Sequence, residues 1–191
     1  MNNRKVYISG EIVPEVDAKI SIFDSAVLLG DTVTESTRTF NFKPFKLDEH
    51  LERLYKSFKL TRIDPQMTIE EMKKVSLELL EINKDNYKAN EDCWLVHNIS
   101  RGHSITGGNP TLQVSKPTVM IYTQPMNLVL WAPFYTKGCH AVTPPTRMVP
   151  SQSLDARIKN RSRLFYTLAE IEAKLVDPDA QSVILDIHGN V

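Results

Sequence analysis

The chain has 191 residues, 41% of them apolar, which is enough to bury an ordinary core in one large domain or two small ones. Its 23 basic and 23 acidic residues balance, so no net field favours nucleic acid or an anionic membrane, and we expect neither as a partner. No apolar stretch approaches the length of a membrane span, and the N-terminus runs into a short strand, so we expect a cytoplasmic protein.

The first forty residues predict sheet. Residues 6–8 and 11–13 flank the turn-like pair Ser9-Gly10 and predict a β-hairpin that Pro14 ends. Residues 19–23 alternate with a period of two, and so does the β-branched run of residues 32–40, so each predicts a strand. We expect the apolar stretch of residues 26–30 between them to be a loop.

Two amphipathic helices should follow and cover the sheet. Asp48 is a candidate N-cap for a helix with apolar positions at the spacing of one face, namely Leu51, Leu54, Tyr55 and Phe58. Thr68 and Glu71 have the spacing of a capping box before a second helix that ends near Asn83. Its apolar positions are Ile69, Met72, Val75, Leu79 and Leu80.

The rest of the chain predicts further strands at residues 93–100, 118–124 and 139–143, separated by loops rich in Gly or Pro. Cys93 and Cys139 form no CxxC pair, which argues against a zinc site or a disulfide framework, and we expect both to be buried small hydrophobes. A helix striped by Leu164, Leu168, Ile171 and Leu175 must end by Pro178, and a strand at 183–187 should follow.

Lys159 is the candidate catalyst, because it lies in the cation-rich connection of residues 155–164. Repulsion from Arg157, Arg161 and Arg163 favours the uncharged amine, and only an uncharged amine can form a Schiff base. The competing interpretation is a solvated basic loop, since Lys and Arg are almost always exposed.

Four local patterns occur in order along nearly the whole chain: residues 6–11 with 22–24 and 29–31; residues 33–38 leading through 43–45 into 48–54; Ser100-Arg-Gly102; and Ile158-Lys159 with 163–164, 168–169 and 172–173. Together they resemble the class IV, fold-type IV family of pyridoxal phosphate enzymes. This family includes branched-chain and D-amino acid aminotransferases, (R)-amine transaminases and aminodeoxychorismate lyase. The resemblance implies a two-domain α+β fold, with a small α/β sandwich domain over residues 1–128. Residues 129–191 would begin a larger, β-barrel-like cofactor-binding domain.

The resemblance also implies roles for two residues. Lys159 matches the family lysine that holds pyridoxal 5′-phosphate as a Schiff base and shuttles the proton. Arg53 matches the arginine that grips the cofactor phosphate, and its planar fork can bind two phosphate oxygens. The alternative for Arg53 is an exposed helix residue paired with Glu49. In the family a glutamate pairs with the pyridine nitrogen soon after a Gly-Asn-Val turn; since this sequence stops at Gly-Asn-Val191, we expect it to be the front part of a longer protein.

The substrate-pocket candidates implied by the resemblance lie on two strands: Thr34, Ser36, Arg38, Trp94 and Val96. Branched-chain enzymes usually have an aromatic residue where this chain has Thr34, and a tyrosine and an arginine at the other strand's two positions. D-amino acid enzymes place an arginine and a histidine a few residues beyond the Arg-Gly pair, whereas this chain has His103 followed by Ser-Ile-Thr-Gly-Gly there. The pocket is therefore atypical for both groups.

Two of these positions have open alternatives. Arg38 shares a strand face with Thr34 and Ser36, where it could receive a substrate carboxylate. It could equally pair with Glu35 or Glu11 on the outer face. His103 could line the pocket mouth or lie in a solvated loop.

The family resemblance implies an aminotransferase, most similar to the branched-chain group, that moves an amino group between an amino acid or amine and a 2-oxo acid. Pyridoxal 5′-phosphate would be its cofactor, with no metal. An aminodeoxychorismate lyase, a D-amino acid or (R)-amine transaminase, and a cofactor-free binding or scaffold module are the alternatives. A homodimer is also implied, in which residues 26–31 and 103–110 could reach the partner's pocket.

Overall fold

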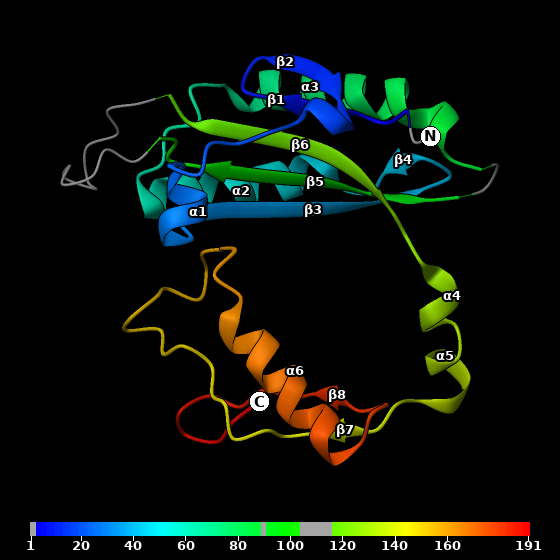
Figure 1. Cartoon of the computed structure of the whole chain (residues 1–191), viewed down its shortest axis with the longest axis vertical. Helices are drawn as coiled ribbons and strands as arrows, with labels where there is room; N and C mark the ends of the chain where they lie inside the picture. The colour runs from blue at the N-terminus through cyan, green and yellow to red at the C-terminus, as the bar shows by residue number, and fades with distance from the viewer. Residues whose placement is uncertain (1–2, 89–90, 104–115) are drawn as a thin grey trace. The chain divides into compact units, whose positions relative to one another are not determined.

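A computed structural model describes residues 3–88, 91–103 and 116–191 (Figure 1). The chain divides into two compact units: residues 1–126 with 158–161, and residues 127–157 with 162–191. The first unit thus ends just before the boundary expected at residue 128, and it includes the short segment that carries Lys159. Helices and strands mix within each unit, in agreement with the predicted α+β class.

The first unit is built on a six-stranded sheet with the order β2-β1-β6-β5-β3-β4, in which all pairs are antiparallel. Its strands are β1 (Lys5–Ile8), β2 (Glu11–Pro14), β3 (Thr32–Phe40), β4 (Lys43–Pro44), β5 (Cys93–Ser100) and β6 (Thr118–Pro125). The predicted hairpin is confirmed as β1 and β2, and both turn residues, Ser9 and Gly10, have positive φ as a tight hairpin requires. The strands predicted at residues 32–40 and 93–100 are confirmed.

Two helices, α2 (Leu47–Thr61) and α3 (Ile69–Asn83), pack on one face of this sheet, behind it in Figure 1. The predicted apolar stripes account for this, because Leu51 and Leu54 of α2 and Met72 and Leu79 of α3 are fully buried. They join Leu95, Ile99 and Ile121 of the sheet in one core. Burying each such side chain contributes about 1.5–3 kcal/mol to folding.

Helix caps explain where these helices begin. The capping box is confirmed: the Thr68 hydroxyl accepts from the Glu71 N–H, and the Glu71 carboxylate accepts from the Thr68 N–H. The predicted cap at Asp48 is wrong. Helix α2 begins after Lys46, whose backbone is left-handed, and Asp48 lies in the first turn, where its charge still complements the helix dipole.

The chain between β2 and β3 differs from the prediction in two places. A short 3₁₀ turn, η1 (Glu15–Asp17), follows β2, and residues 19–23 form no strand. Ser21 accepts hydrogen bonds from the N–H groups of Phe23 and Asp24, and such local bonds compete with a strand ladder. The expected loop at 26–30 is instead helix α1 (Ser25–Leu29), capped by Asp24 and closed by left-handed Gly30.

The second unit contains α4 (Leu128–Trp131), α5 (Phe134–Lys137), α6 (Leu164–Val176) and a parallel pair of two-residue strands, β7 (Ala141–Val142) and β8 (Gln181–Ser182). The predicted helix is confirmed as α6, but the strand predicted at 183–187 is wrong, because the regular ladder stops at Ser182. Cys93 is buried as expected, whereas Cys139 is exposed. In the described part of the chain, no helix has the length and apolar character that crossing a membrane requires.

Candidate functional site

The Lys159 segment lies along the edge of strand β3. The Lys159 carbonyl accepts from the Thr34 N–H at 2.8 Å, and the Arg161 N–H donates to the Thr32 carbonyl at 2.9 Å. A bridge between Val33 and Asn160 lies between these two bonds. Backbone hydrogen bonds therefore fix this segment, and Lys159 is half-buried.

The direction of the Lys159 side chain follows from its neighbours. Ile158 packs against the core beneath the helices. The Arg161 Nε donates to the Asn98 Oδ1 at 2.8 Å, and Asn98 lies on the face of the sheet away from the helices. Because side chains alternate along an extended segment, Lys159 projects to the same face as Arg161. We call this face, opposite α2 and α3, the open face.

All five substrate-pocket candidates share the open face. Even-numbered residues of β3 pair with even-numbered residues of β5: Ser36 lies opposite Val96, and Arg38 lies opposite Trp94. Thr34 and Val96 are buried, and the Thr34 hydroxyl donates to the carbonyl of His97 at 2.9 Å. The other three are half-buried. The candidates thus form a surface two strands wide, with Lys159 at its β3 edge.

Arg38 does not pair with Glu35, and that alternative was wrong. Glu35 lies on the helix-covered face, three residues from Arg38 along β3, so alternation puts their side chains on opposite sides. The Arg38 guanidinium stacks 3.8 Å from the centroid of the Phe40 ring, and its Nε donates to the Thr39 carbonyl. Among the described residues, no carboxylate pairs with Arg38.

Arg53 lies on the helix-covered side of β3, in α2, where it binds Glu35 with two hydrogen bonds. Its Nε and Nη2 donate to the two Glu35 oxygens at 2.7 and 2.6 Å. Glu35 is fully buried and also accepts from the Ser36 N–H and from Nδ1 of His50. The alternative pair of Arg53 with Glu49 was wrong, since Glu49 pairs with Lys46.

Electrostatics keeps the Glu35–Arg53 pair charged. Burial alone would raise the pKa of Glu35, but the hydrogen bonds from Arg53 and from the Ser36 N–H outweigh it, and the pKa lies below its ordinary value. The hydrogen bond to Glu35 raises the pKa of Arg53 in turn. Both groups are therefore ionised at neutral pH.

Ser57 links Arg53 to the Lys159 segment. One turn after Arg53 on α2, its hydroxyl donates to the Arg53 carbonyl at 3.2 Å and accepts from the Lys159 N–H at 3.4 Å. The main chains at Arg53 and Lys159 are therefore joined through Ser57, while the two side chains lie on opposite sides of β3 at this edge. The sequence analysis did not identify Ser57, and it did not predict that Glu35 points toward the helices. For Glu35 the strand pattern contains the information, because Glu35 is two residues after buried Val33 and alternation places both side chains on one face.

Two further positions from the family patterns lie outside this arrangement. Arg101 donates to Asp31 and to the carbonyls of Thr61 and Arg62, so it ties the start of β3 to the end of α2. His103 is exposed, with its ring centroid 5.8 Å from that of Phe23. The remainder of the 103–110 stretch lies outside the described residues.

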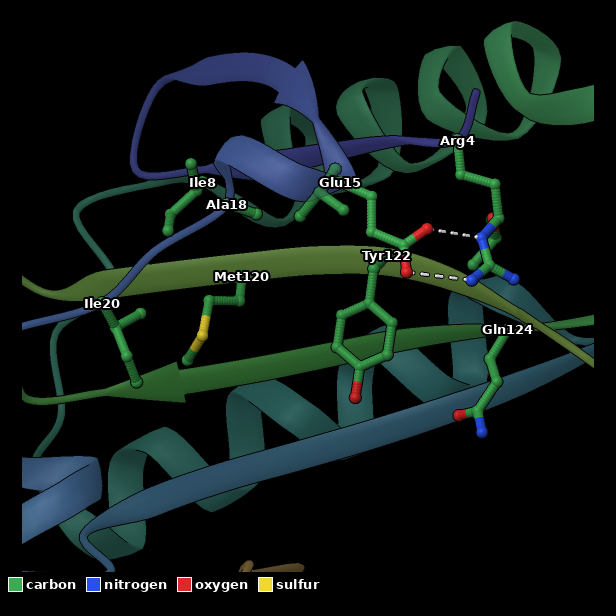
Figure 2. Close-up of a pocket in the computed structure, with 10 residues that line it drawn as sticks. Arg4, Ile8, Glu15, Ala18, Ile20, Met120, Tyr122 and Gln124 are labelled. Atoms are coloured by element: carbon green, nitrogen blue, oxygen red, sulfur yellow. Dashed lines mark hydrogen bonds and ion pairs between the residues drawn. The ribbon is translucent and has the colours of Figure 1, made fainter. Parts of the chain in front are cut away.

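A hollow of about 410 Å³ opens over β1 and β6. Figure 2 shows residues that line it. Apolar residues such as Ile8, Ile20 and Met120 line it, and the Arg4–Glu15 ion pair lies at one side. None of the site candidates lines this hollow. No cluster of His, Cys, Asp or Glu able to hold a metal occurs in the parts of the chain that the structure describes.

Comparison with known proteins identifies the family. The model of the class IV aminotransferases matches residues 32–191. The chain belongs to this family, as the motifs predicted.

Individual relatives are also named as aminotransferases. A Methanocaldococcus jannaschii protein, named as a candidate branched-chain-amino-acid aminotransferase, is 35% identical over 187 residues, which cover 98% of this chain and 61% of that protein. D-alanine aminotransferase of Staphylococcus epidermidis is 35% identical over 123 residues, 63% of this chain and 41% of the relative. The chain thus spans less than two thirds of the length of these relatives.

Solved structures confirm the fold-type IV architecture. A branched-chain amino acid aminotransferase from T.th., crystallised with pyridoxamine 5′-phosphate, superposes with a TM-score of 0.84 at 24% identity, over 98% of this chain and 61% of that one. The Escherichia coli enzyme gives 0.82 at 22% identity, over 98% and 61% of the two chains. At such identities these structures establish the fold alone.

Proposed function

We propose that the full-length protein is a pyridoxal 5′-phosphate-dependent aminotransferase that moves an amino group between a branched-chain-like amino acid or an amine and a 2-oxo acid. The observation that carries this proposal is that the Ser57 hydroxyl joins the main chains of Arg53 and Lys159 at one edge of β3, which anchors both residues in the same part of the first unit. The relatives named as branched-chain enzymes support the substrate class. A cytoplasmic location fits such metabolism and is part of the proposal.

The residues present fit the cofactor. One edge of the Arg53 guanidinium, Nε and Nη2, is hydrogen-bonded to Glu35, and 51% of the side chain is exposed. Its other edge can therefore hold the phosphate, as a planar fork suits two oxygens. Lys159 supplies the amine that attaches the cofactor.

Bound pyridoxal phosphate would supply the electron sink that makes the substrate's carbon acidic. The protein's own work is then positioning and proton transfer. The Lys159 amine would then be the base that takes a proton from the substrate carbon and delivers it in the later half of the amino transfer. The open face, with Thr34, Ser36 and Trp94, holds the substrate side chain, and Arg38 receives its carboxylate.

The test of this function is Lys159→Ala in the full-length protein, with Lys174→Ala, an exposed lysine in α6, as the matched control. We expect the first variant to lose at least about 10³-fold in amino transfer from L-leucine to a 2-oxo acid, and the second to keep it. Borohydride reduction followed by peptide mapping should place the cofactor on Lys159. Label at another lysine, or full transfer by Lys159→Ala, would refute the role.

A second candidate is a transaminase for D-amino acids or (R)-amines, which the D-alanine aminotransferase relatives favour over part of the chain. D-alanine and (R)-1-phenylethylamine as donors separate it from the first candidate. A lyase of the aminodeoxychorismate type would release pyruvate without any acceptor, and a scaffold module would bind no cofactor at all.

A further inference from the structure

Glu35 is a buried carboxylate whose oxygens accept several hydrogen bonds. It has no exposure, and its oxygens accept from Arg53 twice, from His50 once and from the Ser36 N–H. A carboxylate can only accept, so the His50 Nδ1 carries the hydrogen of that bond. Removing a carboxylate from water costs several kcal/mol, and an apolar pair of the same volume often stabilises a fold as well or better. Stability alone therefore gives little reason for this pair.

The orientation of Arg53 gives a better reason. Glu35 takes the Nε and Nη2 edge of the guanidinium at 2.7 and 2.6 Å. No residue in the described part of the chain accepts a hydrogen bond from Nη1, and half of the side chain is exposed. The plane of the guanidinium is thus fixed from inside, and its second edge faces outward.

Such fixing matters for anion binding. A mobile arginine side chain loses about 2 kcal/mol of rotamer entropy when it is immobilised by a ligand. An arginine already held in one orientation has lost that freedom on folding, so the anion meets a fixed fork. His50 lies one turn before Arg53 on α2, and its Nδ1 contacts Glu35 Oε1 at 3.1 Å, the same oxygen that accepts from Arg53 Nη2. His50 therefore also restrains the carboxylate that holds Arg53.

We propose that Glu35, restrained by His50, is a positioning residue that holds Arg53 by one edge so that the other edge grips a phosphate monoester dianion. This proposal rests on the proposed function, in which that phosphate belongs to the cofactor. Glu35 touches neither the cofactor nor the substrate. It acts through Arg53, and its contribution depends on the phosphate group alone.

The experiment compares pyridoxal 5′-phosphate with pyridoxal, which lacks the phosphate, on the full-length apoprotein. Dissociation constants are measured by absorbance for the unchanged protein, Glu35→Gln and Glu49→Gln. The last variant removes the same charge from an exposed position on the same helix as Arg53. We expect Glu35→Gln to weaken binding of pyridoxal 5′-phosphate about tenfold, since a charge-assisted bond to the fork is lost. Binding of pyridoxal should change by less than about twofold in the same variant, and Glu49→Gln should leave both ligands unaffected.

A second set of variants uses Arg53→Lys, because lysine keeps the positive charge beside Glu35 but lacks the planar fork of the guanidinium. If Glu35 acts through Arg53, Glu35→Gln in the Arg53→Lys background should cause no further loss of phosphate selectivity. Thermal unfolding of each variant, and binding of inorganic phosphate followed by ³¹P NMR, show whether a folded protein is being measured. Should Glu35→Gln fold poorly, Glu35→Asp tests the same point, since its shorter carboxylate shifts the fork and should again weaken only the phosphorylated ligand.

Equal losses for both ligands would overturn the proposal, because they would mean a general structural role. Unchanged selectivity in Glu35→Gln would overturn it as well, while leaving the proposed function intact. A failure of the proposed function looks different: the unchanged protein would then bind neither pyridoxal compound.

Discussion

At the residue scale, His97 is a buried titratable group of the first unit. It lies on β5 opposite Glu35, has no exposure, and its Nε2 meets the Ser76 hydroxyl at 2.8 Å. Ser76 donates to the Met72 carbonyl, so Nε2 must be the donor in that contact. Its Nδ1 has no hydrogen-bond partner among the described residues. Burial lowers the pKa of His97 to about 4, which keeps the ring neutral at physiological pH.

The pKa of His97 predicts a pH-dependent stability. The unfolded chain binds a proton at His97 below about pH 6.5 while the folded chain does not until about pH 4, so stability falls as the pH drops through this window. The expected loss is roughly 3 kcal/mol. Urea unfolding at several pH values measures it, and His97→Gln should flatten the curve between pH 6.5 and 4. A slope that persists in His97→Gln would assign it to other groups.

Arg38 predicts a change in substrate selection. Its guanidinium lies on the open face against Phe40, beside Ser36 and across from Trp94. If it receives the substrate carboxylate, Arg38→Ala should raise KM for L-leucine by about tenfold or more, because a charge-assisted hydrogen bond is lost. For (R)-1-phenylethylamine, which has no carboxylate, KM should stay unchanged. Steady-state kinetics on both donors decide this, and an equal rise for both would assign Arg38 a structural role.

At the element scale, α1 and α6 show what a local sequence pattern can and cannot predict about a helix. Apolar periodicity predicted helix α6, but the striped residues, such as Leu164 and Leu175, are exposed in the structure, and Ala169 and Ala173 are the buried ones. The period of a helix is set by its backbone, whereas the side that becomes buried depends on what packs against it. Helix α1 illustrates the reverse: five residues are too few for a helical period, and a capping carboxylate at Asp24 decided the outcome.

Strand β3 was easier to predict than its neighbours in the chain. Its β-branched alternation runs through nine residues, and the structure confirms both its bounds and its period. The shorter alternation at residues 19–23 has the same period but pairs with no strand among the residues that the structure describes. Strand pairing needs a second chain segment, which a local pattern cannot supply.

At the scale of the whole molecule, helix α1 predicts how the protein associates. Val27, Leu28 and Leu29 are more than half exposed and lie together on this helix, beside exposed Phe23. An apolar cluster of this kind is typical of an interface, and we propose that it is part of the homodimer contact implied by the family.

Replacing both Leu28 and Leu29 with Lys should therefore raise the dissociation constant of the dimer by at least about tenfold, because two charges would have to be buried in the contact. Sedimentation equilibrium of the full-length protein measures this constant. The control is Leu60→Lys on α2, another partly exposed leucine, which should leave the dimer intact. Identical constants for the double variant and the control would exclude α1 from the interface.

The candidate site depends on contacts across long distances in sequence. Lys159 and Ser57 are 102 residues apart, and Arg53 and Glu35 are on different elements. The motifs marked Lys159 and Arg53 as a pair of chemical interest, and the alternation of β3 put Thr34, Ser36 and Arg38 on one face. Neither could predict that residues 158–161 add to the edge of β3, or that Glu35 turns inward to hold Arg53.

The sequence by itself determined what depends on neighbours in the chain: the hairpin at Ser9-Gly10, the capping box of α3, the period of β3 and the family motifs. Turn geometry, capping and alternation are local, so a few residues suffice to specify them. The tertiary structure decided which carboxylate holds Arg53 and which strand edge receives Lys159. These choices follow from the packing of α2 against the sheet, which brings buried polar groups to partners that satisfy them, and no local pattern contains that information.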